Sequence, residues 1–139
     1  RVRLLPGVAP ALRRLRKSGF LLIVISNQSG VGRGLIRRDQ AAAVHARVVS
    51  LLESAKAPVD DWYYCLHHPD AACECRKPAP GLIVRAARDW HVDLPSSFMI
   101  GDKSTDVEAG QRAQCRSILL DPGHGGWESA IRSIFGWSP

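Results

Sequence analysis

The stretch FLLIVISNQSG, residues 20–30, decides the fold of this protein. Its apolar part, Phe20 to Ser26, is a continuous run of the kind found in strands that are buried on both faces. The segment that follows, Asn27 to Gly34, holds three glycines in eight residues, which is typical of a loop. The stretch therefore predicts a buried strand that ends in polar side chains.

Helical and strand patterns alternate on both sides of this strand. Apolar spacing predicts a helix with Val8, Leu12 and Leu15, ended by Gly19. A second helix is capped by Asp39, ends before Pro58, and has an apolar stripe of Val44, Val48, Leu51, Leu52 and Ala55. Further strands are expected at Trp62–Leu66, Phe98–Ile100 and Ser117–Leu120, and further helices around 83–90, 105–113 and 128–135. This alternation predicts an α/β fold with a parallel sheet covered by helices on both faces.

The composition is that of one globular domain, residues 1–139. Hydrophobic residues make up 45% and charged residues 23%, which argues against disorder. There is no apolar run of about 18 residues, so we expect no membrane span. There is no signal peptide either, so we expect a cytoplasmic protein, with a monomer as the simplest state. Because the first residue is Arg1 and not Met, we also expect a fragment or a processed chain.

Basic residues gather at the start of the chain. Residues 1–38 hold nine basic side chains and no acidic one, within a formal net charge of +6. Such an excess fits a phosphate-bearing partner, and a solvated basic face is the alternative. Nucleic acid would require aromatic residues among the basic ones for base stacking. Phe20 is the only aromatic residue there and belongs to the apolar run, so we expect a small phosphorylated molecule and no nucleic acid.

Four soft metal ligands lie within eleven residues, in the pattern Cys65-x-His67 and Cys73-x-Cys75. Three thiolates and one imidazole complete a closed tetrahedral zinc shell, which has no open position for catalysis. Disulfides or unrelated thiols are the alternatives, although Cys73 and Cys75 are poorly spaced to pair with each other. His68 is an alternative ligand. We expect a structural zinc ion in the loop 65–75, and a buried thiol at Cys115.

Three further motifs suit a phosphate ester at the carboxyl ends of the strands, where open parallel sheets bind ligands. The segment 26–30 offers a hydroxyl, an amide and approachable backbone N–H groups. Arg76 and Lys77 follow the zinc loop, which would fix their origin. Asp102 stands where a carboxylate holds Mg²⁺, and Asp106, one helical turn later, would orient Lys103 or the metal shell. The alternatives are a polar turn, a solvated basic pair, and helix capping by Asp102 or Ser104.

Taken in order, SNQSGVGRG, CLH…CECRKPAPG and GDKSTDVEAG resemble the motifs of the haloacid dehalogenase superfamily of phosphatases. The likeness extends from about Leu5 to Leu120. It is greatest to the D-glycero-D-manno-heptose 1,7-bisphosphate phosphatases, with the phosphatase part of the histidinol-phosphate enzymes next. The serine in NQSG and the lysine in GDK favour the heptose family. The resemblance implies a Rossmann-like, three-layer parallel-sheet domain that hydrolyses a small sugar phosphate with Mg²⁺.

The resemblance also implies a role for each motif residue. Ser26 and Asn27 match the residues that hold the transferred phosphoryl group, with Gln28 and Arg33 near the substrate. Lys77 matches the lysine that balances charge on the nucleophile and the phosphate, and Arg76 and Lys103 match substrate contacts. Asp102 matches the acid that binds Mg²⁺. The zinc ligands are matched by Cys65, His67, Cys73 and Cys75.

Family members begin with a strand that ends in Asp-x-Asp-x-Thr, a motif these 139 residues do not contain. In the family, the first Asp forms the phosphoaspartate, the second is the general acid and then the base, and the strand is central to the sheet. A covalent mechanism needs its nucleophile, and Asp39, Asp60 and Asp61 do not follow an apolar strand. We therefore expect a nucleophile upstream of this sequence and little or no hydrolysis by these residues alone. A zinc-stabilised pseudoenzyme that keeps the phosphate pocket is the alternative.

Overall fold

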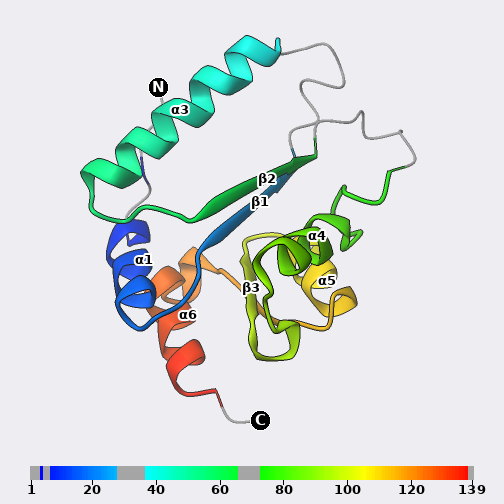
Figure 1. Cartoon of the computed structure of the whole chain (residues 1–139). Helices are drawn as coiled ribbons and strands as arrows, with labels where there is room; N and C mark the ends of the chain where they lie inside the picture. The colour runs from blue at the N-terminus through cyan, green and yellow to red at the C-terminus, as the bar shows by residue number, and fades with distance from the viewer. Residues whose placement is uncertain (1–3, 5–6, 28–36, 66–72, 138–139) are drawn as a thin grey trace. The chain divides into compact units, whose positions relative to one another are not determined.

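The computed structural model describes residues 4, 7–27, 37–65 and 73–137, and these form an α/β fold with parallel strands (Figure 1). The chain divides into two compact units, Arg1–Ala71 and Ala72–Pro139. The predicted fold class is confirmed. The four described strands form two parallel sheets of two strands each, one sheet in each unit. No described strand pairs with strands of both sheets. No helix in the described part of the chain is both long and apolar enough to cross a membrane.

The first unit consists of two helices and two strands. α1 (Val8–Lys17) precedes β1 (Ile23–Asn27), and α3 (Arg38–Ser54) precedes β2 (Asp61–Cys65). The strands run parallel, with each residue of β1 beside its partner in β2 from the first to the last position. α1 forms where its apolar spacing predicts it, and it ends just before Gly19, whose φ of +92° suits glycine.

β1 is shorter and less buried than the sequence predicts. The apolar run begins at Phe20, but the strand begins at Ile23, and Leu21 is 39% exposed. Residues 23–26 are only half-buried. Among the described strands, β1 pairs with β2 alone.

The start of α3 also differs from the prediction. Arg37, and not Asp39, occupies the N-cap position. The side chain of Gln40 accepts a hydrogen bond of 2.9 Å from the backbone N–H of Arg37. Asp39 lies inside the first turn, where its negative charge suits the helix dipole.

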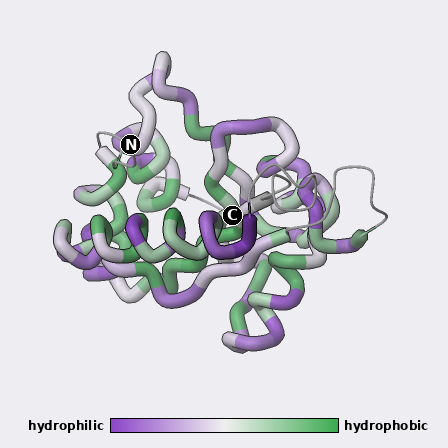
Figure 2. Tube along the Cα trace, turned by 90° about the horizontal axis from the view of Figure 1, so that it is seen from above, coloured by the Kyte–Doolittle hydropathy of each residue, from purple (hydrophilic) through white to green (hydrophobic). Residues whose placement is uncertain are grey.

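Four residues of the predicted apolar stripe, Val48, Leu51, Leu52 and Ala55, are buried or half-buried, and Val44 is the exception. Leu52 is the buried residue of this helix, while Val44 is 47% exposed. The ring of His45 contacts the rings of Trp62 and Tyr64 on β2, with centroids 4.8 and 5.5 Å away. His45 and Leu52 are two turns apart and share one face of the helix. Figure 2 shows hydrophilic and hydrophobic residues following one another along the helices.

The second unit holds the remaining elements. It begins with α4 (Gly81–Trp90) and the short 3₁₀ helix η1 (Leu94–Ser96). A strand–helix–strand segment follows, made of β3 (Phe98–Gly101), α5 (Ser104–Arg112) and β4 (Arg116–Leu119). The unit ends with η2 (Pro122–His124) and α6 (Gly126–Phe135). Its buried apolar side chains include Leu82, Ile83, Ala86, Ala109, Ile118, Ile131 and Ile134.

The elements of this unit lie at the predicted places, but several are less buried than predicted. β3 is half-buried along its whole length, and Leu119 at the end of β4 is 55% exposed. Trp90 is 40% exposed, although its spacing places it on the apolar side of its helix. It is the last residue of α4, where the helix no longer has a neighbouring turn to cover it.

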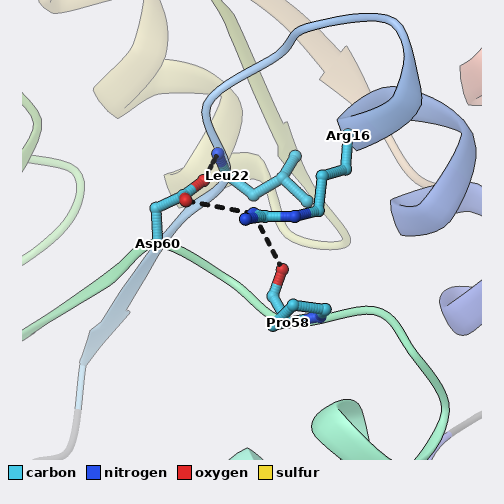
Figure 3. A network of polar contacts seen from close by, with 4 residues as sticks. All are labelled: Arg16, Leu22, Pro58 and Asp60. Carbon is cyan, nitrogen blue, oxygen red and sulfur yellow. Dashed lines mark hydrogen bonds and ion pairs between the residues drawn. The ribbon is translucent and has the colours of Figure 1, made fainter.

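Asp60 connects three segments of the first unit (Figure 3). Its carboxylate accepts a hydrogen bond of 2.8 Å from the backbone N–H of Leu22, at the entrance to β1. It also accepts one of 3.0 Å from Arg16 of α1, and Arg16 donates to the carbonyl of Pro58 at 3.4 Å. The network therefore fixes α1 against the starts of both strands.

A second basic residue of α1 supports the fold in the same way. Arg13 donates a hydrogen bond of 2.7 Å to the carbonyl of Ala55, which follows the last turn of α3. A positive charge at this position also suits the helix dipole. The basic start of the chain was predicted to mark a phosphate-bearing partner or a solvated face. For Arg13 and Arg16 the structure shows a third use, which is to hold the fold together.

Replacing Asp60 by Ala should destabilise the protein by about 1–3 kcal/mol, because a charged acceptor is lost by Leu22 N–H and Arg16. Asp39→Ala is the matched control, because the side chains of Asp39 and its partner Arg37 are 72% and 75% exposed. The control should change the free energy of unfolding by less than about 0.5 kcal/mol. Urea denaturation followed by circular dichroism measures both variants. Equal effects would contradict the structural role of Asp60.

Candidate functional site

Lys77 and Asp106 form a buried ion pair in the second unit. Lys77 lies in the segment before α4, and Asp106 lies in the first turn of α5. Oδ1 of Asp106 accepts a hydrogen bond from Nζ of Lys77, and the two side chains are 7% and 14% exposed. Oδ2 accepts a hydrogen bond of 3.2 Å from the backbone N–H of Lys103. Asp106 therefore uses both oxygens to join the segment before α4 to the start of α5.

The pair fixes a positive charge near the carboxyl end of β3. A buried charge is costly unless it is paired and hydrogen-bonded, so Lys77 is confined to the neighbourhood of Asp106. An ammonium group held in this way suits a phosphate oxygen. Asp106 was predicted to orient Lys103 or a metal shell. It does hold the backbone of Lys103, but its contact with Lys77 was not predicted, because the two residues are 29 positions apart in the chain.

Asp102 is exposed directly after β3. Helix capping by Asp102 or Ser104 was the alternative to a metal-binding role, and that alternative is wrong. α5 begins at Ser104 with Lys103 as its N-cap, and the side chain that binds the N-cap N–H belongs to Asp106. An exposed carboxylate without a capping role, four residues before the aspartate that holds Lys77, suits Mg²⁺ and phosphate oxygens together.

Arg76 carries a buried donor without a described partner. The residue is half-buried, and its Nη1 atom is closed to solvent with no hydrogen-bond acceptor among the described residues. Such a donor costs about 1–3 kcal/mol when it stays unsatisfied. An anionic ligand would remove that cost. The predicted substrate contact at Arg76 thus has a physical reason in this structure.

The cysteine-rich segment directly precedes Arg76. None of the four cysteines forms a disulfide in this structure, so the disulfide alternative is not realised. The sulfur atoms of Cys73 and Cys75 lie within 4.8 Å of each other, which is compatible with two ligands of one metal ion. Cys65 is fully buried at the end of β2 in the first unit. His67 and His68 lie outside the described residues.

Gly81 closes this segment onto the start of α4. Its N–H donates a hydrogen bond of 2.9 Å to the carbonyl of Glu74, which stands between the two cysteines. A Cβ atom at position 81 would lie 2.1 Å from that oxygen, so the approach requires glycine. A zinc ion was predicted to hold the backbone from which Arg76 and Lys77 extend. The structure shows a backbone hydrogen bond that anchors this segment, and the spacing of the sequence did not indicate it.

The predicted residues on β1 are only partly described. Ser26 is half-buried and lies beside Tyr64 in the register of the sheet. The hydroxyl of Tyr64 is 2.5 Å from Nδ1 of His45, and burial raises the pKa of Tyr64. The side chain of Asn27, together with Gln28 and Arg33, lies outside the described part of the chain.

Cys115, predicted to be a buried thiol, is half-buried in the second unit. Burial raises the pKa of its thiol. Because the thiolate is the reactive form, a raised pKa lowers the share of the thiol that can react near neutral pH.

The chain is similar to proteins that are named as phosphatases. A family model described as HAD-hydrolase-like matches residues 74–132. A D-glycero-beta-D-manno-heptose-1,7-bisphosphate 7-phosphatase of Rhodopseudomonas palustris is 42% identical over 120 residues, which cover 81% of this chain and 67% of that protein. The protein of the same name in Escherichia coli strain K12 is 37% identical, with 82% and 63% covered. The chain thus spans about two thirds of the length of these relatives.

Solved structures agree with this likeness. A D,D-heptose 1.7-bisphosphate phosphatase from B. bronchiseptica, complexed with magnesium and phosphate, is 36% identical with a TM-score of 0.79, over 83% of this chain and 64% of that one. A putative HAD-like phosphatase from Mesorhizobium loti is 29% identical with a TM-score of 0.85, over 95% and 74%. Both likenesses extend well beyond the residues matched by the family model.

Replacing Asp106 by Ala should destabilise the protein by about 3–5 kcal/mol, because the buried ammonium group of Lys77 loses its carboxylate. Glu108→Ala is the matched control on the same helix: Glu108 pairs with Arg112 at 2.6 Å, but its side chain is 47% exposed. The control should cost no more than about 0.5 kcal/mol. Thermal unfolding of the two variants tests this. Similar losses in both would contradict the dependence of Lys77 on Asp106.

Proposed function

This chain belongs to the haloacid dehalogenase-like hydrolases, and from that premise we propose that its protein is a phosphatase acting on a small phosphorylated sugar. The observation that carries the proposal is the buried Lys77–Asp106 pair near the carboxyl end of β3. The same unit contains the exposed carboxylate of Asp102 and the Nη1 donor of Arg76, which has no acceptor among the described residues. A fixed cation, a hydrogen-bond donor and a carboxylate for a metal are the groups that phosphoryl transfer requires.

We propose a D-glycero-D-manno-heptose 1,7-bisphosphate as the substrate. Support comes from the relatives of that name, at 42% and 37% identity. Two residues of the motifs, Ser29 in NQSG and Lys103 in GDK, also favour it. Histidinol phosphate is the second candidate substrate, because the motifs of this chain also resemble those of the histidinol-phosphate enzymes.

In this proposal, each motif residue has one task. Ser26 and Asn27 donate hydrogen bonds to the phosphoryl group, and Lys77 supplies a fixed positive charge beside it. The remaining oxygens of the substrate are bound by Gln28, Arg33, Arg76 and Lys103. Such groups lower the barrier when they are already in place where negative charge develops. The burial of Lys77 and its contact with Asp106 support this kind of preorganisation.

The residues present fit a Mg²⁺ ion, which we propose binds at Asp102. Mg²⁺ takes one or two carboxylates together with phosphate oxygens, and Asp102 offers an exposed carboxylate without a capping role. When bound, the ion offsets negative charge on the phosphate. The phosphoaspartate route also needs an Asp-x-Asp-x-Thr motif, which these 139 residues lack. We therefore propose that the nucleophile is an upstream Asp, and that residues 1–139 alone hydrolyse phosphate esters slowly or not at all.

We further propose that Cys65, His67, Cys73 and Cys75 bind a structural zinc ion. Three observations support this: the spacing of the ligands, the absence of a disulfide between the four cysteines, and the short distance between the sulfur atoms of Cys73 and Cys75. Cysteines that form no disulfide also suit the reducing cytoplasm, which we propose as the location. The metal would hold the segment from which Arg76 and Lys77 emerge, and would take no part in the reaction.

The protein expressed from its complete reading frame should release phosphate from the heptose bisphosphate with Mg²⁺. Lys77→Ala should lower kcat/KM by about 100- to 1,000-fold, because a fixed positive charge at the phosphate is lost. Glu108→Ala, at an exposed pair, should retain full activity. A phosphate-release assay measures both, and the upstream sequence should encode an apolar strand that ends in Asp-x-Asp-x-Thr.

The same assay separates the alternatives. Release from histidinol phosphate alone would select the second candidate substrate. No hydrolysis of either compound, with retained phosphate binding, would contradict the phosphatase and select the pseudoenzyme. Residues 1–139 alone should bind inorganic phosphate weakly in calorimetry, and unchanged binding after Lys77→Ala would contradict the role of Lys77.

Zinc should protect Cys73 and Cys75 from iodoacetamide, and a chelator should expose them, because a coordinated thiolate is not free to react. Cys115 should react slowly in both states, since burial raises its pKa. Peptide mass spectrometry and zinc analysis measure these effects. Cys75→Ser should lose the metal, while Cys115→Ser, the control, should keep it. Equal reactivity of all four cysteines with and without chelator would contradict the zinc site.

A further inference from the structure

We infer that Gly101 is a positioning residue, which keeps Lys77 in place by leaving room for Asp106. Gly101 is the last residue of β3, and Asp106 lies in the first turn of α5. The inference rests on one part of the proposed function, which is that Lys77 contacts the phosphate group of the substrate. The need for glycine here is one of space, since Gly101 is not among the glycines with a positive φ.

Asp106 packs against the bare backbone of Gly101. A Cβ atom at position 101 would lie 2.2 Å from Cβ of Asp106, 2.3 Å from its Oδ2 and 2.4 Å from its Cγ. Carbon atoms in good contact are about 3.5–4.0 Å apart, so all three distances are far too short. Because Cβ of Asp106 is itself one of the clashing atoms, a new rotamer would not relieve the clash. The start of α5 would have to move away from β3.

Such a movement acts directly on Lys77. Oδ2, which clashes, is the atom that binds the backbone N–H of Lys103, and Oδ1 of the same carboxylate binds Lys77. A side chain at position 101 would therefore withdraw the carboxylate from Lys77, whereas the N–H of Lys103 belongs to the same helix start and would move with it. Lys77, now 14% exposed, would lose the contact that confines it. Displacing a catalytic group by about 1 Å can cost roughly 100-fold in rate.

Gly110 offers a matched control on the same helix. A Cβ atom there would lie 2.2 Å from Oγ of Ser117 and 2.6 Å from Cβ of Met99, so Gly110→Ala displaces the last turn of α5 from the sheet, at the opposite end of the helix from Asp106. None of those contacts involves Asp106. Gly110→Ala should thus disturb the packing of α5 while it leaves the pair with Lys77 intact.

The first measurement is the rate at which acetic anhydride acetylates Lys77, followed by peptide mass spectrometry of the protein expressed from its complete reading frame. Exposed Lys56, in the first unit, serves as the internal reference. Gly101→Ala should raise the ratio of Lys77 to Lys56 acetylation several-fold, and Gly110→Ala should leave it near the wild-type value. Equal ratios in the two variants would overturn the inference.

The second measurement is steady-state kinetics of the same proteins with the heptose bisphosphate. Gly101→Ala should lower kcat by about 100-fold, while Gly110→Ala should keep kcat within a few-fold of wild type. An equal loss in both variants would overturn the inference while the proposed function stands. An inactive wild type would overturn the proposed function, and the acetylation ratio would still decide the role of Gly101.

A third comparison applies if Gly101→Ala does not fold. The double variant Gly101→Ala with Asp106→Gly lacks all three clashing atoms, and its urea midpoint is compared with that of Asp106→Gly alone. Equal midpoints support the inference, because the clash then has no partner. A clearly lower midpoint in the double variant would show that Gly101 acts through other contacts, and would overturn it.

Discussion

The carboxylate of Asp106 is the group on which the candidate site depends. It is buried, so its charge has to be matched, and it is matched by Lys77 on one oxygen and by the backbone N–H of Lys103 on the other. These two contacts tie an irregular segment to the start of a helix. Because the carboxylate needs room beside β3, the last residue of that strand has no side chain. One charged group thereby sets the positions of a strand end, a helix start and the lysine of the site.

The first unit is organised around a carboxylate as well, with a different result. Asp60 accepts hydrogen bonds from the N–H of Leu22 and from Arg16, and so joins α1 to the starts of both strands. Arg16 is 43% exposed at its side chain, whereas Lys77 is 14% exposed. Asp60 also lies at the amino ends of its strands, away from the edge at which parallel sheets bind ligands. Similar chemistry therefore supports the fold in one unit and the site in the other.

Much of the secondary structure follows from local pattern. Val8, Leu12 and Leu15 at helical spacing, with Gly19 behind them, are enough to locate α1, because the spacing and the stop signal act within a few residues. Burial was less predictable. The spacing of α3 identifies a helix, but whether Val44 or His45 faces β2 depends on where that strand lies. The position of β2 is set by contacts between distant parts of the chain.

The chemistry of the candidate site divides in the same way. The sequence by itself determined which residues can act: a lysine after the cysteine-rich segment, an aspartate after a strand, and ligand spacing suited to zinc. These predictions rest on motifs, which keep reactive groups close along the chain. Only the tertiary structure decided that Asp106 pairs with Lys77, 29 residues away, and that Gly81 and Gly101 must lack side chains. Those facts depend on atoms brought within contact distance by packing, which no local pattern specifies.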